Sequence, residues 1–244
     1  IEKIRESLGL NEPAHIRYFN WIIGVLQGDF GISYNDGSKI SGIISSKLTA
    51  TLELMFTSLF FSSIFGILLG MISALKKYST TDHILTIFGM IGLSIPSFFF
   101  GLASIKLLSV DLQLLPFGGR MSPDTESFTR LLKLIQPAFV LALLEIAAVM
   151  RYSRSTMIDV LKKEYIITAR SKGLPEWKIN FNHGFRTALT PIIVLLAFRI
   201  PGLIGGSIII ETVFLWPGMG STFIMAVEGR DYNLVMMISL IVSA

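Results

Sequence analysis

The sequence predicts an all-α integral membrane protein, folded as a polytopic bundle of helices. Hydrophobic residues make up 52% of the 244 residues, and the mean hydropathy is +0.65, which is too apolar for an ordinary soluble domain. The apolar residues gather in stretches close to the length, about 20 residues, that a helix needs to cross a bilayer. Since lipid offers no partner to backbone N–H and C=O groups, these stretches are expected to be helical.

Residues 1–47 precede the first long apolar stretch and mix charged with apolar residues. Asn11-Glu12-Pro13 is a helix-start signal, with proline near the first helical position. Apolar residues follow at helical spacing: Ile16, Phe19, Ile22, Ile23 and Leu26. They predict an amphipathic helix, which either lies along a membrane surface or packs as a small soluble helix. Gly28 and Gly31 then predict a turn, because glycine tolerates positive φ.

Residues 48–244 form the predicted transmembrane domain, which contains five apolar stretches. These are 51–75, 84–110, 131–150, 189–214 and 233–244. Pro96 lies between Ser94 and Ser97 in the middle of the second stretch, so a kink is predicted there. The chain does not begin with Met, and its last apolar run is too short to span. We therefore expect a fragment of a six-span protein in which about four spans are complete.

The charges of the loops between these stretches orient the chain. Residues 151–187 carry eight basic and three acidic residues, and residues 76–83 begin with Lys76-Lys77. By contrast, residues 111–130 hold two basic and three acidic residues, and residues 215–231 hold one basic and two acidic residues. The positive-inside rule therefore places 76–83 and 151–187 in the cytoplasm and 1–47 on the extracytoplasmic side.

The longest basic, polar and helix-forming segment runs from residue 164 to residue 191. Residues 155–172 predict a helix, and Gly173 is placed to end it in the left-handed conformation. Pro175 and Glu176 predict the start of a second, short helix. Its apolar side chains are expected to be exposed anchors: Trp177, Ile179, Phe181 and Phe185. A passive tether needs neither a fixed turn nor a tryptophan, so a docking surface is favoured.

Motifs of one known family follow one another along nearly the whole chain. They are Gly28-Asp-Phe-Gly-Ile-Ser33, Ala50-Thr-Leu-Glu-Leu54, Ser94-Ile-Pro-Ser97, Arg151 to Met157, Tyr165-Ile-Ile-Thr-Ala-Arg-Ser-Lys-Gly-Leu174, Glu211-Thr-Val-Phe214 with Trp216-Pro-Gly-Met-Gly220, and Arg230-Asp-Tyr232. In this order they resemble the permease subunits of ABC importers, and in particular the first permease subunit of the dipeptide/oligopeptide/nickel family.

The general importer pattern is partly kept in the central segment. Ile167-Thr168-Ala169 stands where that pattern has Glu-Ala-Ala, and Gly173 matches its glycine. His183 and Phe185-Arg186 replace the later Ile and Leu-Pro of the pattern. This departure is usual for the peptide branch, so the resemblance favours that branch over sugar-type permeases.

The resemblance implies a type I ABC importer permease fold and a transmembrane subunit of an ATP-driven importer of peptides, nickel or metal–chelator complexes. A docking segment for a separate ATPase is implied at Glu164, Thr168, Ala169, Arg170, Lys172, Gly173, Leu174, Pro175, Trp177, Ile179 and Phe181. The implied partners are a homologous second permease, two ABC ATPases, an extracytoplasmic substrate-binding protein and the lipid bilayer, with no nucleic acid. ATP and Mg belong on the ATPase, so this chain is expected to bind no cofactor or metal directly and to have no catalytic residue. The implied location is the plasma (inner) membrane of a bacterium or an archaeon.

Two charged residues, Glu145 and Arg199, lie inside predicted spans. A charge there costs on the order of 3 kcal/mol, so each should face protein or a water-filled path. At about 1.5 Å of rise per residue their heights differ by roughly 7 Å, which two long side chains could bridge. In one interpretation they line the substrate path with Ser94, Pro96 and Ser97, and Arg199 meets a carboxylate while Glu145 meets an amine or a cationic complex. In the other they form a structural pair.

Three further charged residues lie near the predicted outer ends of spans. Lys106 and Glu211 are expected to extend towards the bilayer surface, and Glu53 to contact a partner or a loop.

Several other functions are excluded or remain as alternatives. No Gly-x-x-x-x-Gly-Lys-Ser/Thr motif occurs, which excludes a P-loop ATP site, and the absence of cysteine excludes disulfides and thiolate metal sites. Ser207 lies in a span, but the three histidines fall at span ends or in loops, so an intramembrane serine protease would lack a base. The alternatives are an ATP-independent secondary transporter or channel, whose uptake survives loss of ATP hydrolysis, and a membrane assembly scaffold.

Overall fold

The computed structural model describes residues 12–120 and 127–243. Within these residues the chain is helical, apart from loops and one isolated bridge between Ile32 and Lys39. The first eleven residues of the predicted extracytoplasmic segment lie outside the described residues. The chain divides into two compact units, and each is described by itself: unit 1 comprises Ile1–Leu48 and Thr222–Ala244, and unit 2 comprises Thr49–Ser221.

Unit 1 contains the amphipathic helix α2 (Ala14–Leu26) and the apolar helix α11 (Tyr232–Ser243). It also holds the first residues of α3 (Ile40–Leu75) and the end of α10 (Met219–Glu228), a helix in a region where the sequence predicted only a loop. The chain turns after α2 with Gly28 at φ +84° and Gly31 at φ +76°, as their sequence predicts.

Asp231 ties the loop after α2 to the start of α11 within unit 1. Its carboxylate accepts hydrogen bonds from the Ser33 hydroxyl, from the Tyr34 backbone N–H at 3.0 Å and from the Leu234 N–H at 3.2 Å. Burial by itself raises the pKa of Asp231, but these hydrogen bonds outweigh it and leave the pKa below its ordinary value.

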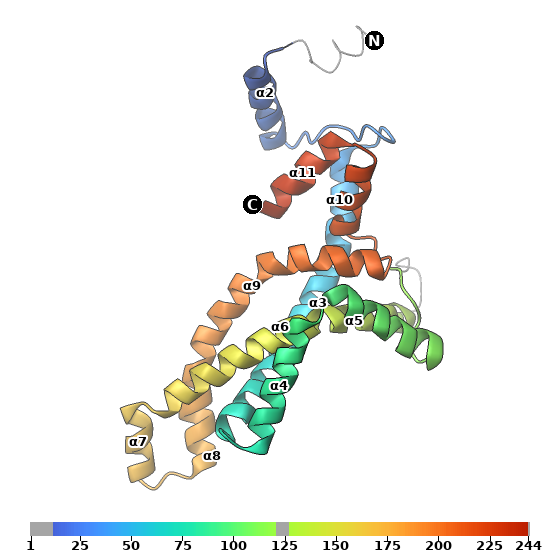
Figure 1. Cartoon of the computed structure of the whole chain (residues 1–244). Helices are drawn as coiled ribbons and strands as arrows, with labels where there is room; N and C mark the ends of the chain where they lie inside the picture. Colours follow the sequence, from blue (N-terminus) through green and yellow to red (C-terminus); the bar gives the residue numbers. More distant parts are fainter. Residues whose placement is uncertain (1–11, 121–126, 244) are drawn as a thin grey trace. The chain divides into compact units, whose positions relative to one another are not determined.

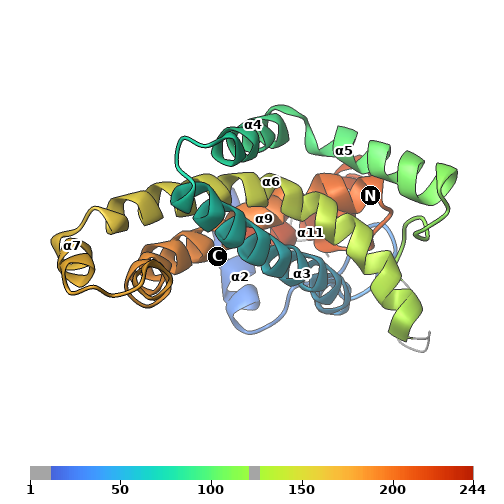
Figure 2. The same ribbon diagram turned by 90° about the horizontal axis from the view of Figure 1, so that it is seen from below.

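Unit 2 contains the remaining helices (Figure 1). After the main part of α3 they are α4 (Thr80–Ser94), α5 (Ser97–Ser104), the π-helix η1 (Ile105–Asp111), α6 (Ser127–Leu161), α7 (Glu164–Ser171), α8 (Glu176–Lys178), the π-helix η2 (Ile179–Phe185) and α9 (Arg186–Val213). In Figure 2, α6 runs between α4 on one side and α3 and α9 on the other. Packing of α6 against α9 and α4 forms the centre of the unit.

Among the described residues, three helices are long and apolar enough to cross a membrane: Ile40–Leu75, Phe128–Leu161 and Glu176–Val213. A fourth is obtained if α4 and the α5–η1 helix are counted as one span, bent by 100°. The sequence predicted a kink at Pro96, and the structure has a full break. Ile95 is extended (φ −92°, ψ 129°) because the ring of Pro96 disfavours a helical residue before it.

The core of unit 2 is a close packing of helices around α6. One cluster joins Ala50 and Leu54 of α3 to Leu141 of α6 and to Leu203 and Ile210 of α9. Two glycines of α3 permit the approach. A Cβ on Gly66 would lie 2.7 Å from Val149, and one on Gly70 would meet the backbone of Met150, so neither position has room for a side chain.

Candidate functional site: a bent segment and an intramembrane ion pair

The predicted docking segment begins with a break that the sequence did not predict. Residues 155–172 were expected to form one helix, but α6 ends at Leu161 and α7 begins at Glu164 after an extended Lys163 (φ −69°, ψ 148°). The break lets α7 fold back, because Ile166 and Ala169 are buried against Ile179. Burial of these apolar side chains therefore outweighs the continuous helical propensity of the segment.

Gly173 has the left-handed conformation that its position predicts. Its φ is +74°, and it directly follows Lys172, the C-cap residue of α7. Its N–H donates to the Arg170 carbonyl at 2.9 Å, which closes the turn. Pro175 is extended (φ −68°, ψ 143°) and caps the restart of the helix at Glu176. The bend between α7 and α8 is thus fixed by backbone geometry.

A salt bridge spans this bend. Arg170 Nε lies 2.8 Å from Glu176 Oε1, and the second guanidinium nitrogen lies 3.2 Å from Oε2. Both side chains are largely exposed, so the pair orients the turn more than it stabilises the fold.

The exposed and the buried residues of the segment separate clearly. Large side chains that face outward are Tyr165 (44% exposed), Ile167 (55%), Trp177 (66%) and Phe181 (51%). Ile179 was expected to be an exposed anchor, but it is fully buried, and Ala169 is buried beside it. Glu164, Thr168, Lys172 and Pro175 are exposed, whereas Leu174 is half-buried against the same cluster. The segment is therefore a small folded knob with its own core.

This knob is joined to a membrane helix without interruption. From Glu176 the chain runs as one continuous helix through α8, η2 and α9 to Val213, with Pro191 and Pro201 inside α9. The sequence predicted a short helix separate from a span at 189–214, and that separation is absent. Gly184 permits η2 to approach α6 closely, since a Cβ at this position would lie 2.9 Å from Met157 of α6. A displacement of the knob would consequently move α9 with it.

A second anchor near the knob was missed by the sequence analysis. The Arg154 guanidinium of α6 donates two hydrogen bonds, both of 2.7 Å, to the two carboxylate oxygens of Asp82 in α4. Asp82 also accepts from the Ser73 hydroxyl and from the Tyr78 N–H at 2.9 Å. It thus fastens the α3–α4 corner to α6. The sequence offers one signal for this contact, the acidic residue Asp82 in the predicted loop 76–83, but the sequence analysis treats that loop only as basic.

The two charged residues within predicted spans face each other. Arg199 Nη1 of α9 lies 3.7 Å from Glu145 Oε2 of α6. This separation is too long for a hydrogen bond, and Oε2 is buried without a hydrogen-bond partner among the described residues. The Arg199 side chain is 39% exposed and that of Glu145 17%. The pair is therefore in contact electrostatically, with hydrogen-bonding capacity unused on both sides.

Two polar residues, Ser94 and Ser97, flank Pro96 at the helix break. Ser94 donates to the Met90 carbonyl at 2.9 Å, Pro96 caps α5, and Ser97 begins that helix. A Cβ on Gly92 of α4 would lie 3.6 Å from Ala147, so the end of α4 approaches α6 within one turn of Glu145. In the described part of the chain, no hydrogen bond links Ser94 or Ser97 to Glu145 or Arg199.

Glu211 does not extend to a bilayer surface as expected. It is fully buried, and its carboxylate accepts from the Thr51 hydroxyl at 2.7 Å and from the Ser221 N–H at 2.9 Å. The Thr51 oxygen in turn accepts from the Met219 N–H at 2.8 Å. Glu211 thus holds the loop after α9 against α3. Glu53 contacts a loop, as one of its two expectations had it, through Arg120 at 2.8 Å, and it also contacts Arg130 of α6 at 2.9 Å.

Comparison with known proteins adds the family. Residues 66–244 match the family model described as binding-protein-dependent transport system inner membrane component. Over 98% of its length the chain is 42% identical to the oligopeptide transport system permease protein AppB of Bacillus subtilis (strain 168), of which it covers 77%. It is also 34% identical to the probable D,D-dipeptide transport system permease protein DdpB of Escherichia coli (strain K12), with 100% of the chain and 78% of that protein covered.

A third relative is the glutathione transport system permease protein GsiC of Salmonella choleraesuis (strain SC-B67). It is 34% identical, over 96% of this chain and 74% of its own length. Among solved structures, the inward-facing MetNI methionine ABC transporter superposes with a TM-score of 0.64 at 14% identity, over 82% of this chain and 90% of that one. An amino acid ABC transporter superposes with a TM-score of 0.58 at 17% identity, over 83% of this chain and 86% of that one. These two likenesses establish the fold.

Proposed function

The chain belongs to the family of binding-protein-dependent transport system inner membrane components, and from this premise we propose that it carries peptides and is driven through the bent knob at residues 164–181. It is a transmembrane permease subunit of an ABC importer, with the all-helical fold of that class. Such permeases work with ATPase and substrate-binding partners and lie in an inner membrane as multi-pass proteins.

Peptides are the proposed cargo because of the molecules for which the curated relatives are named. The three curated relatives described above are named for the transport of oligopeptides, D,D-dipeptides and glutathione, all of which are peptide-like molecules. The nickel and metal–chelator cargoes expected from the sequence stay predictions, since none of those three names includes a metal.

The Glu145–Arg199 pair is the proposed contact for the peptide inside the path. A peptide in solution carries an ammonium group and a carboxylate, which are complementary to the two side chains. The separation of 3.7 Å leaves both groups free to turn towards a ligand without breaking a good hydrogen bond. The assignment of Ser94, Pro96 and Ser97 to the same path stays a prediction, because α4 contacts α6 at Leu143 and Ala147, on the face opposite to Glu145.

The observation that carries the coupling proposal is the continuous helix that leads from the knob through η2 into α9. Trp177 and Phe181 project from this helix with 66% and 51% of their surface exposed. They are suited to fill a groove on a separate ATPase, since aromatic anchors dominate such contacts. Arg199 lies on the same helix. A shift of the knob on ATP binding would therefore move one member of the peptide-binding pair.

The remaining partners are proposed from the family, whose members work with ATPase and substrate-binding partners. We propose a homologous second permease, two ABC ATPases that hold ATP and Mg, and an extracytoplasmic binding protein. Residues 151–187 then face the cytoplasm and residues 1–47 the outside, in agreement with the loop charges.

Uptake by the assembled transporter in proteoliposomes tests the proposal. We expect a labelled di- or oligopeptide to enter only when the binding protein is outside and ATP is inside. Uptake without ATP hydrolysis would instead identify a secondary transporter or channel, and efficient uptake of a nickel–chelator complex but of no peptide would replace the proposed cargo.

A further inference from the structure

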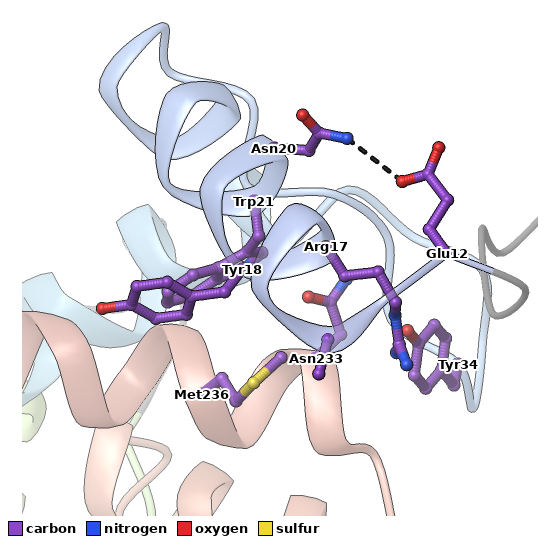
Figure 3. A pocket seen from close by; sticks show the side chains of 9 residues that line it. Glu12, Arg17, Tyr18, Asn20, Trp21, Tyr34, Asn233 and Met236 are labelled. Carbon is purple, nitrogen blue, oxygen red and sulfur yellow. Dashed lines mark hydrogen bonds between the residues drawn. The ribbon is translucent and has the colours of Figure 1, made fainter.

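Unit 1 contains an open cavity of about 500 Å³ that the proposed transport path does not use (Figure 3). Its volume lies in the range, roughly 300–1,000 Å³, that is usual for sites of small ligands. The helix α2 forms one wall, and Asn233 and Met236 of α11 contribute to another. The charged pair assigned to the path, Glu145 and Arg199, belongs to unit 2, so the cavity and that pair have no residue in common.

The cavity lies on the side of α2 that is opposite to its apolar stripe. Four lining residues recur three or four residues apart and share one face of the helix: Ala14, Arg17, Tyr18 and Trp21. The exposed apolar stripe occupies the other face: Ile16, Phe19, Ile23 and Leu26. When that stripe is covered, by a membrane surface or by another apolar surface, the cavity still opens to water. Its ligand is therefore expected to be a water-soluble molecule.

Two opposite charges line the cavity with capacity to spare. Among residues 12–120 and 127–243, Arg17 forms no salt bridge. The Glu12 carboxylate accepts one long hydrogen bond of 3.3 Å from Asn20, and it pairs with no cation in this part of the chain. Figure 3 shows the Glu12–Asn20 contact on one side of Arg17 and Tyr34 on the other. The cavity thus offers a ligand one group that binds an anion and one that binds a cation.

A buried donor of the cavity is without a partner. Nε1 of Trp21 is buried, and its N–H finds no acceptor in the described part of the chain. A buried donor that lacks an acceptor costs free energy, which a ligand recovers if it supplies a carbonyl or carboxylate oxygen. The amide of Asn233, by contrast, already donates to the Ile32 carbonyl at 2.9 Å. Trp21 and Arg17 are therefore two donors with unused capacity.

The remaining lining is largely aromatic and apolar. The ring centroids of Tyr18 and Trp21 lie 6.1 Å apart, and Figure 3 shows both rings on the side of Met236. Tyr34 adds a third ring beside Arg17. Aromatic rings favour offset or edge-on contact with another ring and bury a large apolar area. This wall suits an apolar or aromatic side chain of a ligand.

We propose that this cavity binds a short peptide with free termini, on the extracytoplasmic side to which residues 1–47 are assigned. The Arg17 guanidinium pairs with the terminal carboxylate, and the Trp21 N–H donates to a peptide carbonyl. The Glu12 carboxylate pairs with the terminal ammonium. A side chain of the peptide packs against Tyr18 and Met236. The site rests on the proposed function for the class of its ligand, and it holds cargo before the cargo enters the path.

A short peptide fits the cavity better than two other water-soluble partners. A neutral sugar stacks on aromatic rings but leaves both charges of the cavity without a partner. A loop of the binding protein has no free termini and would have to present two charged side chains at the matching spacing. A peptide of a few residues carries an ammonium group, a carboxylate, carbonyls and a side chain in one small molecule, so it is complementary to every part of the lining.

Photo-cross-linking of a dipeptide to the assembled transporter tests the site. The probe is alanyl-4-benzoylphenylalanine, which has free termini and a photoreactive ring. It is added without binding protein and without nucleotide, so that no transport takes place, and the labelled residues are located by peptide mass spectrometry. We expect saturable label on α2 or α11 at residues that line the cavity. Unlabelled alanyl-phenylalanine should compete about ten-fold better than its N-acetylated or its C-amidated form.

Variants of the two charged residues separate their roles. Arg17→Gln should weaken the labelling about ten-fold, and Arg17→Lys should restore most of it, because the positive charge returns. Glu12→Gln should remove the discrimination against the N-acetylated competitor while labelling persists. Lys39→Gln is the matched control, because Lys39 is an exposed cation of the same unit outside this cavity.

Three results would overturn the proposal. One is equal labelling of Arg17→Gln and Lys39→Gln, with the helix content of the wild type in both by circular dichroism; if Arg17→Gln loses helix content, retained discrimination in Glu12→Gln decides in the same way. Another is label confined to the surroundings of Glu145 and Arg199. The third is weaker attachment of the binding protein to Arg17→Gln at unchanged peptide labelling, which would make the cavity a docking site for that protein.

None of these results contradicts the proposed function. That function fails only if the wild-type transporter takes up no peptide when binding protein and ATP are both present. Uptake by the wild type is therefore measured in the same preparation, so that loss of the cavity site and loss of the cargo assignment give different outcomes.

Discussion

Gly173 determines the direction in which the proposed docking knob points. At φ +74° a residue with a Cβ is strained by roughly 1–2 kcal/mol, and a β-branched residue by more. There is no atom within 4 Å of the position that a Cβ would occupy, so the effect of a substitution comes from the backbone and not from a clash.

Gly173→Val is therefore expected to uncouple transport. Relief of the strained φ turns Trp177 and Phe181 away from the ATPase, so peptide uptake per ATP hydrolysed should fall several-fold while the subunit remains inserted. The measurement is uptake and ATP hydrolysis in the same proteoliposomes. Gly37→Val is the matched control, since Gly37 also has positive φ (+71°) and open space but lies in unit 1. Unchanged coupling in Gly173→Val would mean that the knob does not transmit motion.

Arg199→Gln tests the proposed path. Loss of the positive charge should lower peptide uptake about ten-fold or more, because a charge pair with the cargo is lost, and should leave assembly of the transporter intact. Arg151→Gln, an exposed arginine on α6, serves as the control. Loss of assembly in place of uptake would assign Arg199 to a structural pair with Glu145 and exclude the contact with substrate.

At the scale of elements, two polar contacts fasten helices whose sequences give little warning of them. Asp82 joins the α3–α4 corner to α6 through the bidentate contact with Arg154. Asp231 joins the α2–α3 loop to α11 within unit 1. Each carboxylate is buried and nearly saturated with donors, so its replacement leaves donors without a partner.

Asp82→Asn should lower the unfolding free energy by roughly 1–3 kcal/mol, because the Arg154 guanidinium loses its charged partner. The Arg154 side chain is 28% exposed, so water replaces part of the lost interaction with the guanidinium. The loss of unfolding free energy therefore stays below the upper end of the range for buried ion pairs. Thermal unfolding of the purified transporter in detergent measures the change. Asp159→Asn, which removes an exposed contact of 3.9 Å with Lys162, should have no measurable effect. Equal shifts in the two variants would contradict the account.

The Asp231 contact predicts a pH dependence in unit 1. Because the folded-state pKa lies below the ordinary aspartate value of 3.8, the contact stabilises the fold above that value and loses its contribution as the pH falls through the folded-state pKa. Hydrogen exchange at the Tyr34 amide, corrected for intrinsic exchange, should therefore accelerate below about pH 4 in the wild type. In Asp231→Asn it should be fast throughout. A wild-type amide that stays equally protected at acidic pH would exclude this role.

Hydrophobic patterning located the apolar stretches that lie in α3, α6 and α9 and their order along the chain. It was insufficient where tertiary contacts decide the local structure. Nothing local marks the end of α6 at Leu161, which depends on burial of Ile166 and Ala169 against Ile179. For the same reason Ile179 could not be distinguished from Trp177 as an anchor, since spacing alone does not say which apolar side chain finds a core.

The polar contacts divide in the same way. Gly173 and Gly31 could be predicted, because positive φ is a local requirement that glycine meets. The environment of Glu211 could not be, because its partner Thr51 is 160 residues away along the chain. The Glu145–Arg199 contact could be predicted only in part. Helix rise placed the two residues at reachable heights, but only the packing of α6 on α9 brings them to 3.7 Å.

For the whole molecule, the central claim is that ATP hydrolysis on a separate chain reaches the membrane helices through the knob at residues 164–181. The claim joins three features: an exposed aromatic pair, a fixed bend, and a continuous helix into α9. The 244 residues contain no cysteine, so an introduced cysteine is unique within this sequence.

Site-directed cross-linking in the assembled transporter tests this claim most directly. Trp177→Cys and, as a control, Leu215→Cys place one cysteine at positions where the native side chain is equally exposed, 66% in both, and which lie at opposite ends of the α8–α9 helix. A thiol-directed photo-crosslinker on residue 177 should capture the ATPase, with a yield that changes when ATP is added, whereas residue 215 should not capture it. Capture of the ATPase from residue 215 and not from residue 177, or from neither, would contradict the account.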